Sequence, residues 1–346
     1  MSSTEELSER EQRVLAAIVQ TYIETAEPAG SQTVARRSGL GISPASIRAT
    51  MSDLESKGFL FHKHTSAGRI PTDRAYRTYV DTLMRRSPPS RAARETLHAE
   101  LGGRRSAIEE VLRRAAQVLG VLTLELGVAA APALDEAVLE RLELLPVASD
   151  RVLLVLSLQS GVARTIFVEV PGSLAPEVVQ QVARILNERL AGLPLGVIRA
   201  SLADRLRDAD GTGQGSELLN IFIAQAGELF QLEGPQSGVL LGSATMLAEQ
   251  PEFASSADRM RELVELTDQR DLLGRALAGR RGSGLSITIG AENPDPRLAG
   301  FTLVTSAYRS GDLRGVIGVL GPTRMPYDKI IGLVDHTSRL VEGLMK

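Results

Sequence analysis

The chain has 346 residues and balances 39 Lys and Arg against 42 Asp and Glu, a length that predicts two or three domains. Hydrophobic residues make up 43% and charged residues 23%, which excludes global disorder. The absence of cysteine excludes disulfides, thiolate zinc sites and a cysteine nucleophile. No apolar run reaches the ~20 residues that span a bilayer, and no signal-peptide pattern is present, so we expect a soluble, cytoplasmic protein without a membrane partner.

Helix signals are dense at the N-terminus until Ser87-Pro88-Pro89-Ser90 interrupts them, so residues 1–86 form the first predicted domain. Ser8 and Glu11 have the spacing of a capping box, which predicts a first helix. Apolar residues then recur every three or four positions along this helix, which indicates one buried face.

Two shorter helices are predicted next. Ser31 is expected to cap the second, Gln32–Ser38, and Ser43 the third, Pro44–Lys57, with proline at its first position. Gly58 is a typical residue to end the third helix. Two short helices joined by a glycine-containing turn and packed on another helix predict a helix-turn-helix.

The outward face of the third helix is the predicted recognition surface. Arg48 is able to make a bidentate contact with guanine, and the small residues around it permit close approach of phosphates. The alternative for Arg48 is a solvated surface residue. The helix-turn-helix residues predicted to contact DNA are Ser31, Thr33, Ser43, Ala45, Ser46, Arg48, Ala49, Thr50 and Lys57.

An apolar segment, Phe59–Phe61, a polar basic tip and the pair Arg69-Ile70 follow, which is the pattern of a wing hairpin. The predicted DNA contacts of this hairpin are His62, Lys63, His64, Ser66 and Arg69. Residues 28–80 hold eight Lys and Arg against three Asp and Glu, a net charge of +5 that leaves −8 for the rest of the chain. This asymmetry favours a DNA-binding winged helix over a protein-binding one.

The remainder of the chain predicts strands on both sides of a mainly helical block. A helix is expected at 91–126. Strands are expected at 138–146, 151–158 and 163–170, followed by a helix at 176–190. Helices are expected at 216–231, 238–249 and 256–279, then strands at 285–289, 302–309 and 315–321 and a last helix at 327–345. This order predicts an α+β domain with a helical domain inserted into it.

The residues do not form a catalytic or metal-binding pattern. His62 and His64 lack a third ligand nearby, and the Asp208-x-Asp210-Gly211 run lacks the glutamate that a calcium loop requires at Leu219. No P-loop is present, and no nucleophile stands at a recognisable spacing from a histidine. We therefore expect a protein that is not an enzyme and that needs no metal or cofactor.

Several segments resemble the family of the heat-inducible transcription repressor HrcA. The resemblance is strongest over Ser43–Gly58 (SPASIRATMSDLESKG) and His64–Asp81 (HTSAGRIPTDRAYRTYVD). It continues in Gln250-Pro251-Glu252-Phe253, in Gly290-Ala291-Glu292-Asn293 and in Gly321–Tyr327 (GPTRMPY), and so covers nearly the whole chain.

The resemblance implies a winged helix-turn-helix DNA-binding domain over 1–86 and a GAF-like domain over 91–192 and 281–346, interrupted by an inserted dimerisation domain over 193–280. It also implies a homodimeric repressor of chaperone operons that acts on double-stranded DNA at an inverted-repeat operator called CIRCE. The GroEL chaperonin is the implied partner that keeps such a repressor active until heat-denatured proteins compete for it.

The sequence departs from the family pattern in the recognition helix, where Ala49 and Thr50 replace the usual Asn and Asp. Since asparagine is able to read adenine, this change points to a diverged operator. Two other functions remain open. One is a ligand-sensing regulator with a metabolite site under Gly290–Asn293 and Ser306–Tyr308, and the other is an interaction scaffold whose winged helix does not touch DNA.

Overall fold

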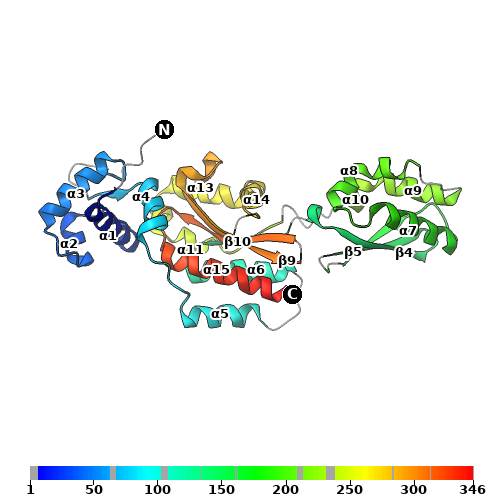
Figure 1. Cartoon of the computed structure of the whole chain (residues 1–346), viewed down its shortest axis with the longest axis horizontal. Coiled ribbons are helices and arrows are strands. Elements are labelled where there is room, and N and C mark those ends of the chain that lie inside the picture. Colours follow the sequence, from blue (N-terminus) through cyan, green and yellow to red (C-terminus); the bar gives the residue numbers. More distant parts are fainter. Residues whose placement is uncertain are drawn as a thin grey trace. The chain divides into compact units, whose positions relative to one another are not determined.

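The computed structural model divides the chain into two compact units. The first comprises Met1–Ala130, Val239–Tyr308 and Val316–Leu344, and the second comprises Ala131–Gly238, Arg309–Gly315 and Met345–Lys346. The structure describes residues 7–62, 68–102, 108–132, 134–159, 161, 163–208, 213–230, 238–282, 284–311 and 313–345. Figure 1 shows the order of the elements along the chain.

The N-terminal part of the first unit, here called the head, is a winged helix-turn-helix, as predicted. Its elements are α1 (Glu9–Thr25), α2 (Ser31–Ser38), α3 (Pro44–Ser56), β1 (Leu60–Phe61), β2 (Ile70–Pro71), α4 (Asp73–Thr78) and a π-helical turn (Tyr79–Leu83). The capping box of Ser8 and Glu11 opens α1, and the stripe that includes Val14 and Ile18 is fully buried. β1 and β2 pair antiparallel, with Leu60 opposite Pro71, and form the base of the wing.

The rest of the first unit, called the GAF-like domain here after the prediction, is built on a five-stranded sheet. Its strands are β3 (Leu126–Ala130), β7 (Val239–Leu241), β8 (Leu285–Ile289), β9 (Phe301–Ser310) and β10 (Leu313–Pro322), and their order is β7-β3-β10-β9-β8. The adjoining ends of β9 and β10, within Arg309–Gly315, belong to the second unit. The longer helices are α5 (Arg91–Leu101), α6 (Ile108–Thr123), α13 (Ala257–Asp268), α14 (Arg270–Ala278) and α15 (Tyr327–Leu344). Shorter helices are α11 (Thr245–Ala248) and α12 (Pro251–Ala254), with 3-10 turns at Gly290–Glu292 and Pro296–Leu298.

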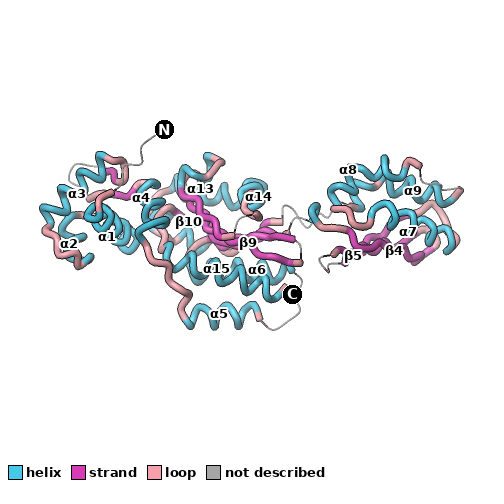
Figure 2. Tube along the Cα trace, viewed as in Figure 1, coloured by secondary structure: helices cyan, strands magenta, loops and turns pink. Residues whose placement is uncertain are grey.

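The sheet of this domain is covered on both faces. Figures 1 and 2 show α6 and α15 on one face and α13 and α14 on the other. The core on the α13 and α14 side joins leucines of these helices, such as Leu263 and Leu273, to Val128, Phe301 and Leu320 of the strands. Alternating strand residues thus reach opposite helical layers, and aliphatic side chains fill most of the core.

The second unit has its own three-stranded sheet and core. Its elements are a 3-10 turn (Leu134–Glu136), β4 (Leu139–Ala148), β5 (Arg151–Leu158), β6 (Ala163–Glu169), α7 (Pro176–Leu190), α8 (Leu195–Leu206), α9 (Gln214–Ala224) and α10 (Ala226–Leu229). The sheet order is β4-β5-β6, and both pairings are antiparallel. Leu142, Leu154 and Val168 on one face of the sheet pack in a common core with Val179 and Leu186 of α7.

The inserted segment lies elsewhere than the sequence pattern predicts. The structure separates residues 131–238 as a unit, whereas the prediction assigned 193–280 to the insertion and the strands of 138–170 to the GAF-like sheet. Since β3 and β7 are short, apolar and without alternation, their pattern does not distinguish them from helix. Ala130 lies opposite Val239 in the sheet, so the insertion leaves and returns at neighbouring positions.

Candidate DNA-binding interface

The start of α3 presents a compact set of polar groups to solvent. Ser43 is the N-cap, and its Oγ accepts a hydrogen bond from the backbone nitrogen of Ser46 at 3.2 Å. Ser43, Ala45 and Ala49 are exposed, and Ser46 is half-buried. Because the first N–H groups of a helix lack intrahelical acceptors, this end is suited to an anion such as a phosphate.

Arg48 lies one residue beyond this first turn and is exposed. Among the described residues its guanidinium forms neither a hydrogen bond nor an ion pair. The side chain therefore remains available for a bidentate contact with a base edge or a phosphate. The adjacent Ala49 is also exposed and offers no polar group.

A second basic residue reaches the same helix end from α1. Arg10 donates from Nη2 to the backbone oxygen of Ser46 at 3.1 Å and brings a positive charge to the first turn of α3. The sequence pattern does not predict this arrangement, because the two residues are 36 positions apart and only the packing of α1 against α3 brings them together.

Three predicted contacts on the helix-turn-helix are not free surface groups. Thr50 is only 4% exposed, and its Oγ1 donates to the backbone oxygen of Ser46 at 3.2 Å, so the prediction of an outward Thr50 is wrong. Ser31 is buried inside the first turn of α2, whose N-cap is Gly30 rather than Ser31. Thr33 is half-buried on the same helix. These burials follow from the packing of α2 and α3.

Lys57 is held inside the head by an ion pair. Its Nζ lies 2.8 Å from Oε1 of Glu11, and the two side chains are 24% and 11% exposed. Hydrogen bonds from Lys57 and from the backbone of Ser8 lower the pKa of Glu11. Lys57 thus joins the end of α3 to the start of α1, a structural role that the prediction of a DNA contact did not include.

Glu55 contacts residues on both sides of the wing. Its carboxylate pairs with the imidazole Nδ1 of His62 and lies 2.8 Å from Nε of Arg69, so one acid of α3 contacts residues that flank both sides of the hairpin tip. The predicted contacts Lys63, His64 and Ser66 lie outside the described residues. His62 is exposed and Arg69 half-buried, so both are at the wing while engaged with Glu55.

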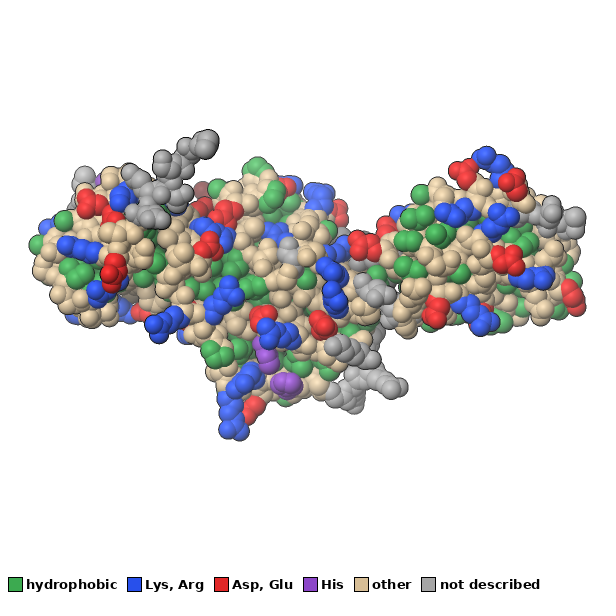
Figure 3. Space-filling view, viewed as in Figure 1, with side chains coloured by type: hydrophobic (Ala, Val, Ile, Leu, Met, Phe, Trp, Pro, Cys, Tyr) green, Lys and Arg blue, Asp and Glu red, His purple; other side chains and the backbone are tan. Residues whose placement is uncertain are grey.

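The positive charge of the head is partly neutralised. Arg37 pairs with Glu24 at 2.5 Å, and the guanidinium of Arg74 stacks on Phe59 at 4.3 Å and donates to the backbone oxygen of Lys57. Figure 3 shows basic and acidic side chains mixed over the visible face of the head. Within α3, Arg48 is the one basic residue, and it forms no ion pair among the described residues.

The polar groups of the candidate metabolite site are engaged internally. Asn293 donates from Nδ2 to the backbone oxygens of Gly290, Leu298 and Phe301. Ser306 hydrogen-bonds Ser338 at 2.9 Å, and Tyr308 donates to the backbone oxygen of Ala130. Over the described ranges no cluster of three His, Asp or Glu side chains is suited to a metal ion, and no helix there is long and apolar enough to cross a membrane.

A helix-turn-helix with an open first turn on α3, followed by a two-stranded wing, defines the class of winged-helix transcription regulators. Residues 109–331 match the model of the HrcA protein C-terminal domain. The chain belongs to the HrcA family of heat-inducible transcription repressors.

Curated relatives extend this match over nearly the whole chain. The chain is 35% identical to the heat-inducible transcription repressor HrcA of Chlorobium phaeovibrioides, covering 96% of this chain and 95% of that protein. It is 34% identical to the HrcA of Geobacter sulfurreducens, with 99% of each chain covered. A crystal structure described as that of a hypothetical protein shares the fold, with a TM-score of 0.63 at 23% identity over 98% of this chain and 99% of that one.

Proposed function

We propose that this protein is a homodimeric repressor of heat-shock chaperone operons that acts in the cytoplasm at a CIRCE-type inverted repeat. The observation that carries the proposal is the exposed start of α3, where Arg48 forms neither a hydrogen bond nor an ion pair among the described residues. In this function α3 lies in the major groove, Arg48 contacts a base edge, and the backbone at Ser43–Ser46 contacts a phosphate.

Dimerisation through the inserted unit is supported by an unusual sheet face. Leu145, Leu153 and Phe167 lie side by side across β4, β5 and β6, on the face opposite the core. Leu145 is 46% and Phe167 64% exposed. A row of exposed aliphatic and aromatic side chains on a sheet is suited to association, and a two-fold axis would pair this face with itself.

Binding to the operator is tested with the purified full chain, a CIRCE-type duplex and a scrambled duplex at two salt concentrations. We expect tighter binding to the repeat, weakened by salt in proportion to the phosphates neutralised. Equal affinity for both duplexes would contradict specificity for this operator, and the absence of salt-dependent binding to either would contradict DNA binding itself.

Control by GroEL is part of the same proposal and rests on the family resemblance. Addition of GroEL to the purified chain is expected to raise the fraction of molecules that bind the operator, and unfolded protein is expected to reverse the gain. The control is bovine serum albumin at equal mass. If GroEL leaves the active fraction of a largely inactive preparation unchanged, the chaperonin is not a positive partner.

A further inference from the structure

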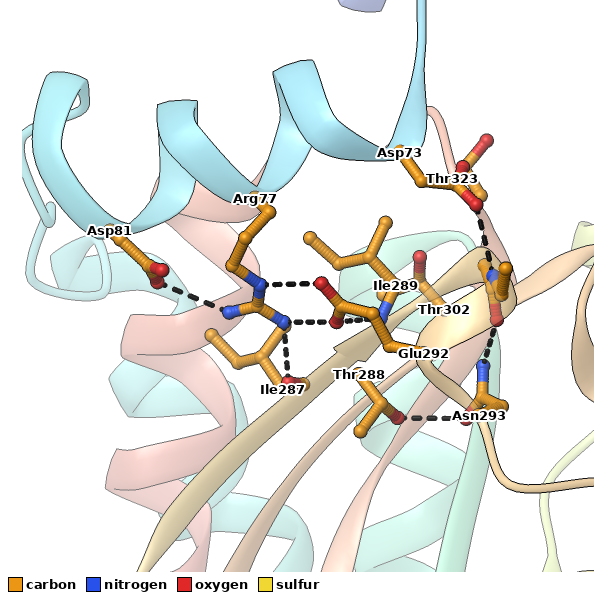
Figure 4. Close-up of polar contacts among 12 residues, drawn as sticks. Asp73, Arg77, Asp81, Ile287, Thr288, Ile289, Glu292, Asn293, Thr302 and Thr323 are labelled. Atoms are coloured by element: carbon orange, nitrogen blue, oxygen red, sulfur yellow. Dashed lines mark hydrogen bonds and ion pairs between the residues drawn. The ribbon is translucent and has the colours of Figure 1, made fainter. Parts of the chain in front are cut away.

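Helix α4 belongs to both the head and the GAF-like domain. Its Tyr76 is buried beside Tyr327 of α15, with ring centroids 6.0 Å apart. The next residue, Arg77, points its side chain at the GAF-like domain, as Figure 4 shows. The helix that follows the wing is thus also the helix that joins the head to the sheet.

Arg77 makes the most extensive contact at this junction. Its Nε lies 2.8 Å from Oε1 of Glu292, and its Nη2 lies 2.5 Å from Oε2 of Glu292 and 2.7 Å from the backbone oxygen of Ile287 (Figure 4). Burial opposes ionisation of Glu292, but hydrogen bonds from Arg77 and from the backbone of Ile289 hold its pKa below the usual value. Such a bidentate pair fixes direction as well as distance.

Asp73 makes a second contact one turn earlier. Its Oδ2 accepts a hydrogen bond from the backbone nitrogen of Ala291 at 2.9 Å. The preceding residue, Gly290, has φ +55°, and a Cβ built there would lie 2.0 Å from the same Oδ2. Glycine is therefore required at this position for the carboxylate to approach the turn.

A third contact comes from the segment before α15. Arg324 donates from Nη1 to the backbone oxygen of Ile23, near the end of α1, at 2.7 Å. Its Nη2 lies 3.0 Å from Oε2 of Glu252, which holds the guanidinium in place. The head therefore contacts the GAF-like domain through α1 as well as α4, so rotation about a single point is prevented.

We define the head clamp as Asp73, Arg77, Gly290, Ala291 and Glu292. Resting on the proposed function, we propose that the head clamp fixes the direction of α3 relative to the GAF-like domain and thereby sets the half-site spacing that the dimer accepts. The physical reason is that two recognition helices read an inverted repeat only when they are held at a defined separation. A freely turning head would bind each half-site but accept many spacings.

The first test needs no DNA. Because the chain has no cysteine, exposed Gln32 in the head and exposed Glu265 in the GAF-like domain are changed to cysteine and spin-labelled. The full chain is diluted with unlabelled protein, and the distance distribution between the labels is measured. We expect one narrow distribution for the parent protein and a broad one after Glu292→Gln or Gly290→Ala.

The second test measures affinity for a single half-site and for inverted repeats whose half-sites are moved apart in steps of one base pair. Glu292→Gln is expected to keep the half-site affinity of the parent, to lose about tenfold at the preferred spacing, and to respond less to spacing. The matched control is Arg339→Gln, which removes an exposed pair with Asp335 on α15 of the same unit.

Three outcomes overturn the proposal. An unchanged distance distribution in both clamp variants would mean that the clamp does not hold the head. A broadened distribution with unchanged spacing preference would mean that head direction does not select the operator. An equal loss of affinity for the half-site and for the repeat would mean that Glu292 only supports folding of the head.

If the parent chain binds no duplex, the proposed function fails and the role in spacing fails with it. The distances between the labels would still show whether the clamp holds the head.

Discussion

Arg48 and Ala49 are neighbours on α3 and both are exposed, yet in the proposed function they contribute differently to recognition. Arg48 offers five donors and a fixed charge, whereas Ala49 offers only a methyl group. We therefore expect the base specificity of this helix to depend on one long side chain and on how close the small residues allow the backbone to come to the DNA.

Replacing Arg48 by alanine is expected to weaken operator binding by about 1–3 kcal/mol and to reduce the preference for the operator over random DNA. Since the side chain is exposed and forms no hydrogen bond or ion pair among the described residues, the thermal stability should not change. Fluorescence anisotropy with both duplexes measures the affinity ratio. A ratio equal to that of the parent would remove Arg48 from base recognition.

Ala49→Asn is expected to shift the preferred operator toward adenine at one position per half-site, because asparagine is able to bind the adenine edge with two hydrogen bonds. Selection from a randomised duplex library measures the change. Thr50→Val is the matched control, since Thr50 is buried and its hydroxyl is bonded within α3. A change of base preference in Thr50→Val rather than Ala49→Asn would contradict the observed faces of this helix.

Glu125 predicts a pH dependence of stability. The side chain is 1% exposed, and burial raises its pKa well above the usual value, although Gln250 and Arg324 act in the opposite direction. Because the folded state binds this proton more tightly than the unfolded state, the stabilising contribution is complete below about pH 4.3 and is lost as the pH rises. The unfolding free energy of Glu125→Gln relative to that of the parent should therefore be higher at pH 8 than at pH 5, as measured by denaturant titration.

At the scale of elements, α1 and α3 are joined at their polar ends as well as through their apolar faces. Lys57 is expected to stabilise the head through Glu11, so Lys57→Met should cost about 1 kcal/mol in unfolding free energy. The salt dependence of DNA binding should stay the same, because this cation is already paired. If the DNA binding of the variant depends less steeply on salt while its stability is unchanged, Lys57 contacts a phosphate after all.

The ion pair of Lys57 and Glu11 also predicts a pH dependence of stability. Since the pKa of Glu11 is lowered, the stabilisation by this pair should be lost only as the pH falls below about 4.3.

Elements with strong local signals are well predicted from the sequence. The capping box, the serine-proline start of α3 and the helix Pro176–Leu190 all appear where the sequence pattern places them. The division between the insertion and the GAF-like domain is not predicted from the sequence, because it depends on which strands pair. The pairing of β3 with β7 joins residues more than a hundred positions apart, and no local pattern encodes it.

The same distinction applies to the candidate interface. Ser43 and Arg48 follow from helix capping and exposure, and both lie on the surface of α3. Thr50 could have been assigned correctly, because it lies three residues after Ile47 and four before Leu54, within the buried stripe of the helix. The contacts of Arg10 and of the head clamp are tertiary, and only the folded chain brings those residues together.

At the scale of the whole molecule, the proposed function combines a recognition helix, a clamp that would direct it and an insertion that would pair two chains. Phe167→Asp places a charge in the exposed row of β4–β6 and should convert the dimer to a monomer, since an unpaired charge at the centre of an apolar contact is costly.

Sedimentation velocity measures this change directly, and the affinity for the inverted repeat should fall toward that for one half-site. The matched control is Val197→Asp, which changes an exposed apolar residue on α8 of the same unit. Because Phe167 lies on the face opposite the core, the stability of each chain should be retained. A Phe167→Asp protein that still sediments as a dimer would place the dimer contact elsewhere, whereas dissociation with undiminished affinity for the repeat would show that operator binding does not need two joined heads.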